Sequence, residues 1–187
     1  MPSQTSRIFR VLLQHPAVRT LAAAAGGTEC HLVGGCLRDR ALGLTSHDVD
    51  AVVAGRGREI AEIVAAELPA RFVLLGGKDF AAYRLVGQDV TVDLWDRAGT
   101  TLHEDLARRD FTVNSFALGL LDGQVADPFG GLDDLSHRKP HDDRCWFIHL
   151  DPSVSCNAAV RSIHSPAASC TISRSERLVS VTLVTRP

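Results

Sequence analysis

The stretch from His31 to Val53 constrains the fold of this chain more than any other part of the sequence. The sequence His-Leu-Val at 31–33 predicts a short strand, a glycine pair at 34–35 breaks it, and residues 36–42 can form a helix. Residues 48–53 then predict a second strand that begins with two carboxylates. The unit therefore joins two strands through a glycine turn and one short helix.

The glycine pair and the helix after it are suited to binding a phosphate. Gly34 and Gly35 let the backbone turn sharply and approach a ligand closely. The start of a helix presents unpaired N–H groups and the positive end of its dipole to an anion. Arg38 lies one turn further on, where its charge can reach the same anion, and Asp39 is placed to orient it. We therefore predict that this turn binds a phosphate.

Asp48 and Asp50 are two residues apart, so on a strand both side chains leave the same face. Such a pair can hold two divalent cations about 4 Å apart, which activate an attacking oxygen and stabilise a leaving one. Mg²⁺ fits because it prefers oxygen ligands and often binds through few carboxylates plus substrate phosphates. A Gly-Gly pair alone is usually a plain turn, and an Asp-x-Asp alone is usually a solvated strand end. The prediction of a site rests on their order along the chain.

This stretch resembles the signature of the class II tRNA nucleotidyltransferases (the CCA-adding enzymes) and the related bacterial poly(A) polymerases. The signature has two apolar residues with Gly-Gly, then Arg-Asp, Leu-Gly and Asp-x-Asp, and this chain has LVGG at 32–35, RD at 38–39, LG at 42–43 and DVD at 48–50. The resemblance implies an α/β fold of the polymerase β-like nucleotidyltransferase type, a small mixed sheet with flanking helices, which we expect on one side. It also implies attack of an RNA 3′-hydroxyl on the α-phosphorus of a nucleoside triphosphate, which releases pyrophosphate, with Mg²⁺ as cofactor.

A third carboxylate is expected on the next part of the sheet. Residues 80–86 and 90–95 can form a hairpin with its turn at 87–89. Thr91, Asp93 and Trp95 then leave one face of the second strand. The superfamily often places a third acid on a strand beside the Asp-x-Asp strand. By that resemblance Asp93 is the candidate third metal ligand or general base, with Asp96 as the alternative.

Residues 104–121 hold a second match, which resembles the family motif Arg-Arg-Asp-Phe-Thr-(Ile/Val)-Asn. If the segment is helical, Asp110 and Asn114 are four residues apart and share a face. An arginine can hold a triphosphate through two parallel hydrogen bonds. The family implies that Arg109 binds the nucleotide and that Asp110 and Asn114 lie near the sugar, whereas Arg108 is expected to be structural.

The remaining predicted elements lie before, between and after these motifs in the sequence. Residues 7–24 predict one or two helices divided near Pro16, and 58–68 predict an amphipathic helix. Residues 72–75 predict a strand, and 116–121 with 124–126 predict a second hairpin. The Asp-Pro-Phe-Gly-Gly sequence at 127–131 resembles the element that closes the family's head domain.

From residue 137 onward the resemblance stops. Relatives continue into a helical neck that selects the incoming base and into helical domains that hold the tRNA, and residues 137–187 show no counterpart. We expect a head domain at 1–136 and an unassigned tail at 137–187, poorly ordered or the product of a shifted reading frame, with a β-prone run at 178–184. Such a truncated form would bind CTP, ATP and Mg²⁺ without choosing between bases. A poly(A) polymerase and a non-catalytic nucleotide-binding fragment stay open as alternatives.

Composition adds few constraints. The net charge of −2 gives no basic footprint for nucleic acid, although a tRNA or another RNA 3′ end is the expected partner. Five cysteines without a metal-ligand spacing predict reduced thiols in a cytoplasmic protein. The longest apolar run is too short to span a membrane. Nothing in the sequence indicates an oligomeric state.

Overall fold

The computed structural model describes residues 4–75, 82–97, 99–109, 111–137, 168–175 and 178–185. Its elements, in chain order, are α1 (Gln4–Leu13), α2 (Pro16–Ala25), β1 (Cys30–Val33), α3 (Gly35–Ala41), β2 (Asp48–Val53), α4 (Gly57–Glu67), β3 (Arg71–Leu75), β4 (Ala82–Val86), β5 (Thr91–Asp96), α5 (Leu102–Ala107), the 3-10 turn η1 (Thr112–Asn114), β6 (Ala117–Gly119), β7 (Val125–Ala126), α6 (Gly131–His137), β8 (Ala168–Ser175) and β9 (Leu178–Thr185). The predicted strand, helix and strand of the first motif are confirmed in β1, α3 and β2. The predicted helix pair divided near Pro16 is confirmed in α1 and α2.

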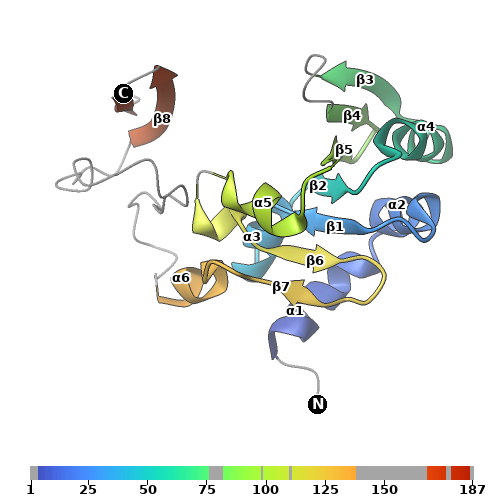
Figure 1. Cartoon of the computed structure of the whole chain (residues 1–187), viewed down its shortest axis with the longest axis horizontal. Coiled ribbons are helices and arrows are strands. Elements are labelled where there is room, and N and C mark those ends of the chain that lie inside the picture. Colours follow the sequence, from blue (N-terminus) through green and yellow to red (C-terminus); the bar gives the residue numbers. More distant parts are fainter. Residues whose placement is uncertain are drawn as a thin grey trace.

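Seven strands form one mixed sheet in the order β3-β4-β5-β2-β1-β6-β7, which Figure 1 shows in the upper right and centre of the molecule. Among these strands only β2 and β5 run parallel, and every other neighbouring pair is antiparallel. The predicted hairpins are confirmed in β4–β5 and β6–β7, although residues 80 and 81 of the first lie outside the described residues. The parallel pair brings two strands together that are far apart in the sequence.

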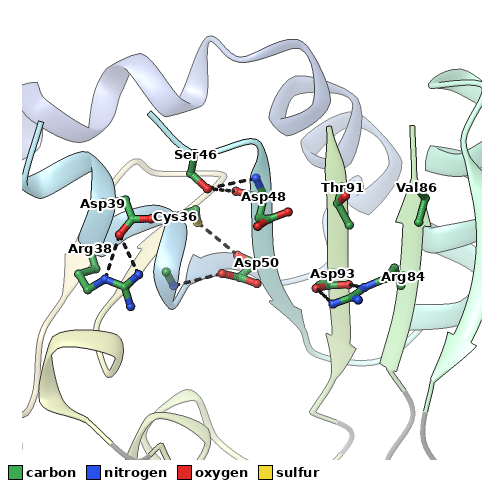
Figure 2. Close-up of a pocket in the computed structure, with 11 residues that line it drawn as sticks. Cys36, Arg38, Asp39, Ser46, Asp48, Asp50, Arg84, Val86, Thr91 and Asp93 are labelled. Atoms are coloured by element: carbon green, nitrogen blue, oxygen red, sulfur yellow. Dashed lines mark hydrogen bonds and ion pairs between the residues drawn. The ribbon is translucent and has the colours of Figure 1, made fainter. Parts of the chain in front are cut away.

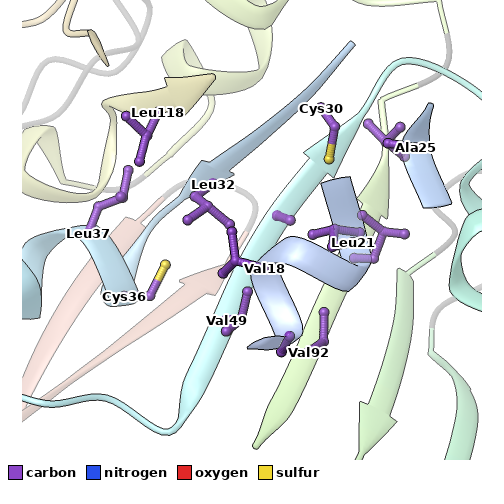
Figure 3. Packing of buried hydrophobic residues seen from close by; sticks show 14 of the residues in the cluster. Val18, Leu21, Ala25, Cys30, Leu32, Cys36, Leu37, Val49, Val92 and Leu118 are labelled. Atoms are coloured by element: carbon purple, nitrogen blue, oxygen red, sulfur yellow. The ribbon is translucent and has the colours of Figure 1, made fainter. Parts of the chain in front are cut away.

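The main hydrophobic core lies on one face of this sheet, under α2, α3 and α4. Leu21 of α2 and Ile60 of α4 are fully buried there, and so are Leu32, Ala51 and Leu94 of the sheet. Figure 3 shows Val18 and Leu21 of α2 lying over the strands β1 and β2. Each fully buried Leu or Ile contributes about 1.5–3 kcal/mol, so this face supplies most of the stability of the sheet.

A smaller cluster covers part of the other face. Val33, Val52 and Ala117 point away from the main core and are buried against Leu106 of α5. Our expectation of helices on one side is therefore corrected, because three neighbouring strands carry apolar side chains on both faces and need a second cover. α5 begins at a capping box in which Thr101 and Glu104 satisfy each other's backbone N–H groups.

The last described segment is the antiparallel hairpin of β8 and β9. The β-prone run predicted at 178–184 is confirmed in β9. The structure does not test the division of the chain at residue 136, so that boundary stays a prediction. Within the described ranges, no helix has the length and apolar character needed to cross a membrane.

Candidate active site

Three carboxylates lie on the same face of the sheet, the one that α5 partly covers. Val49 and Ala51 of β2 point into the main core, so Asp48 and Asp50 leave the opposite face, as predicted. β5 runs parallel to β2 with Asp93 as the direct partner of Asp50. Figure 2 shows the three side chains on adjacent strands. The predicted placement of Asp93 beside the Asp-x-Asp strand is thus found in the structure.

The glycine turn fits closely around Asp50. The Gly35 N–H donates to Asp50 Oδ2 at 3.1 Å. Gly34 has φ 71° and ψ −141°, and a Cβ there would lie 3.2 Å from the same oxygen. Only glycine adopts this backbone readily. We expected the Gly35 N–H to face a phosphate, but in this structure the group is taken by Asp50.

The surroundings of Asp50 disfavour the negative charge of its carboxylate. Burial raises the pKa of this carboxyl, and the neighbouring charge of Asp93 raises it further. Hydrogen bonds from the backbone of Cys36 and Gly35, and the charge of Arg109, act in the opposite direction. A cation bound between the strands would relieve this repulsion.

Arg38 joins the two sequence motifs. Its Nε and Nη2 donate to Asp39 Oδ1 at 2.9 and 2.8 Å, so Asp39 does orient the guanidinium. Its Nη1 donates to Asn114 Oδ1 at 2.8 Å, across 76 positions of sequence. The side-chain oxygen of Asn114 is therefore committed to Arg38, a contact that no local pattern indicates.

The segment after α5 is not one helix. α5 ends at Ala107, and Asn114 lies in the separate turn η1, so the shared helical face of Asp110 and Asn114 stays a prediction. Asp110 itself lies outside the described residues.

Arg109 reaches the glycine turn from the other side. Its Nη2 donates to Asp105 Oδ2 at 3.0 Å, and its Nη1 lies 3.5 Å from the position that a Cβ of Gly34 would take. The Arg109 side chain is 20% exposed, whereas the side chain of Arg108 is 58% exposed and stays 3.8 Å from Asp105. Of the two arginines, only Arg109 lies beside the glycine turn, and its contact with a nucleotide stays a prediction.

An open cavity of about 470 Å³ lies over the carboxylates. Its lining includes Gly35, Arg38, Asp39 and all three acids, together with Cys36, Ser46, Val86, Thr91 and Arg84. Arg84 of β4 is a site residue that we did not predict. Its Nε and Nη2 donate to the two oxygens of Asp93 at 2.8 and 2.7 Å. Alternation along β4 would have placed it opposite Asp93 once the hairpin register was known.

Asp96, the alternative third acid, belongs to another part of the fold. Its two oxygens accept hydrogen bonds from the N–H groups of Gly55 and Gly57, both at 2.9 Å. These contacts hold the turn between β2 and α4. Asp96 is not among the residues that line the cavity.

The donor set of the cavity suits a hard cation. Asp48, Asp50 and Asp93 offer only carboxylate oxygens, which Mg²⁺ prefers. Within the described residues, however, no three acidic, histidine or cysteine side chains are already grouped as a metal-binding cluster. Asp93 is instead paired with Arg84, and one oxygen of Asp50 accepts from Gly35. The residues fit Mg²⁺ in kind, through two carboxylates and oxygens from a substrate.

Comparison with known proteins identifies the same region. Residues 30–139 match the model of the poly A polymerase head domain. A CC-adding tRNA nucleotidyltransferase of Geobacter sulfurreducens is 36% identical over 124 residues, which cover 66% of this chain and 29% of that protein. A CCA-adding enzyme of Streptococcus suis is also 36% identical over 124 residues, covering 61% of this chain and 30% of that protein.

Solved structures agree with the sequence relatives. A CCA-adding enzyme in complex with CTP superposes with a TM-score of 0.63 at 30% identity, covering 72% of this chain and 35% of that one. The Thermotoga maritima CCA-adding enzyme complexed with a tRNA gives a TM-score of 0.59 at 32% identity, covering 68% and 33%. The chain thus spans about a third of the length of the relatives it matches.

Proposed function

This chain belongs to the poly A polymerase head-domain family, and from that premise we propose that it transfers nucleotides from CTP or ATP to the 3′ end of a tRNA. The observation that carries the proposal is the lateral pairing of Asp50 with Asp93, with Asp48 on the same face beneath an open cavity. The proteins of known structure that it resembles include complexes with CTP, ATP and tRNA.

Different side chains would bind the metal, the phosphates and the sugar. Asp48 and Asp50 would hold Mg²⁺, with Asp93 as a further ligand or as the general base for the attacking hydroxyl. Arg38 and Arg109 would bind the triphosphate with charge-assisted hydrogen bonds. As in other phosphoryl transfers, catalysis would consist mainly of positioning and charge neutralisation. When bound, Mg²⁺ would supply charge stabilisation at the reacting phosphate.

Two other residues hold the Arg38 guanidinium in place. Asp39 and Asn114 accept hydrogen bonds from three donors of Arg38, which leaves little freedom to the guanidinium. We therefore assign Asn114 to the positioning of Arg38, in addition to the role near the sugar that the family implies. Asp110 keeps its proposed sugar contact as an untested part of the motif.

All these groups meet atoms that CTP and ATP share. Choice between the bases needs hydrogen bonds to a base edge, because a site that makes them penalises the wrong base by leaving buried groups unpaired. None of the assigned residues offers such a contact. We therefore propose that the head alone binds CTP and ATP alike and extends a tRNA end slowly.

The test combines nucleotide binding with incorporation on a tRNA that lacks its terminal residues. Calorimetry with Mg²⁺ should give similar affinities for CTP and ATP, and slow incorporation should disappear in Asp50→Asn. Asp89→Asn is the matched control, because this acid is exposed on the β4–β5 turn outside the cavity lining.

The other outcomes separate the alternatives. Binding without any incorporation would identify a non-catalytic nucleotide-binding fragment. Unlimited addition of AMP from ATP to any RNA would identify a poly(A) polymerase. Efficient and ordered use of CTP and then ATP would refute the lack of base selection.

A further inference from the structure

Arg84, Asp93 and Asp50 form one lateral row across three adjacent strands. Arg84 is the direct partner of Asp93 across the antiparallel pair β4–β5, and Asp93 is the direct partner of Asp50 across the parallel pair β5–β2. All three side chains line the same cavity, as Figure 2 shows. The contact between Arg84 and Asp93 is therefore built into the register of the sheet and does not depend on a flexible loop.

The ion pair occupies both oxygens of the third carboxylate. Arg84 donates through Nε and Nη2, so it holds Asp93 in the bidentate geometry that arginine and carboxylate favour. Asp93 is buried, whereas the Arg84 side chain is 47% exposed and can move toward the solvent of the cavity. The buried carboxylate of Asp93 is thus paired with a half-exposed guanidinium.

Resting on the proposed function, we infer that Arg84 is a positioning residue that competes with a divalent cation for Asp93. In the nucleotide-free head the guanidinium neutralises the acid and keeps its oxygens aimed at β4. Arg84 leaves these oxygens when a divalent cation binds between β2 and β5. The third carboxylate would then join Asp48 and Asp50 only after this exchange.

The competition predicts a change in metal affinity that does not depend on catalysis. Removing the guanidinium should free both Asp93 oxygens, so Arg84→Met should tighten the binding of Mn²⁺ to the nucleotide-free chain. Because water reaches the half-exposed guanidinium, the ion pair contributes modestly, and the expected gain is about three- to tenfold. Arg84→Lys keeps the charge but lacks the fork, so its affinity should lie between those of the wild type and Arg84→Met.

The measurement is the titration of free Mn²⁺ by electron paramagnetic resonance, with no nucleotide present. Arg71→Met is the matched control, because it removes the same charge from an exposed position on the adjacent strand β3, outside the cavity lining. Thermal melting of each variant shows that it is folded. In Arg84→Met/Asp93→Asn the gain should disappear, since the released carboxylate is no longer there.

Several results would overturn the inference. Unchanged or weaker Mn²⁺ binding by Arg84→Met would show that Arg84 does not compete. An equal gain in Mn²⁺ affinity in Arg71→Met would show that the effect comes from the change in net charge alone. The absence of Mn²⁺ binding in every variant would also overturn it, while the incorporation assay would decide separately whether the proposed transfer function holds.

Discussion

Arg109 and Arg108 provide a direct test of how the phosphates are held. Both belong to the same motif, yet only Arg109 lies beside the glycine turn, with its Nη1 3.5 Å from the position that a Cβ of Gly34 would take. Arg109→Lys keeps the charge but cannot make two parallel hydrogen bonds to a phosphate. The loss of one charged hydrogen bond corresponds to about 1.5–3 kcal/mol, or roughly a 10- to 150-fold weaker affinity.

The assay is calorimetric titration with CTP and with ATP in the presence of Mg²⁺. Arg108→Lys is the control, because the Arg108 side chain is 58% exposed, and its effect should stay within about twofold. Urea unfolding of both variants separates a loss of ligand contact from a loss of stability, since Arg109 also pairs with Asp105. Equal affinities of the two variants would refute the assignment of Arg109 to the triphosphate.

Three further predictions concern the metal, the packing of the head and its pH dependence. Asp48→Asn should abolish incorporation even at saturating Mg²⁺ without lowering the melting temperature, and near-normal transfer would contradict the metal assignment. Gly131→Ala should destabilise the fold by about 1–3 kcal/mol in urea, because the new Cβ would collide with the Thr112 carbonyl oxygen, whereas Gly27→Ala has open space and should cost less. Burial lowers the pKa of His31 in the folded state. Below about pH 6.5 the unfolded chain therefore binds more protons than the folded chain, and the free energy of unfolding falls as the pH decreases. In urea unfolding between pH 7 and 5, His31→Asn should flatten this decline, and parallel profiles of the variant and the wild type would contradict the prediction.

Local patterns predicted the elements that build the site. The alternation of Asp48, Val49 and Asp50 fixed which side chains share a face, and the structure places them accordingly. The turn at 87–89 likewise identified the β4–β5 hairpin and the face of Asp93. These features depend on neighbours in sequence, where backbone geometry alone decides the direction of a side chain.

Contacts between distant segments could not be predicted in the same way. The hydrogen bond from Arg38 to Asn114 depends on where η1 packs, and the packing of α6 against η1 is a tertiary effect. The sequence left open whether a helix continues as far as Asn114, because residues 108–114 contain no proline or glycine to mark the end of α5 at Ala107. Arg84 was missed because its importance follows from its partner across the strand pair, and one arginine in a strand has no pattern of its own.

The arrangement of the two faces explains how the fold accommodates a cluster of acids. Asp50 and Asp93 repel each other in a partly buried place, which costs stability while no cation is bound. The cost is offset locally by the Gly35 N–H on Asp50 and by Arg84 on Asp93. The rest is offset by the main core beneath α2 and α4, which lies on the opposite face of the same strands. On β2 and β5 the apolar side chains of one face pack into the main core, and Asp48, Asp50 and Asp93 on the other face line the cavity. The charged side chains can therefore be arranged for catalysis without disturbing the residues that stabilise the sheet.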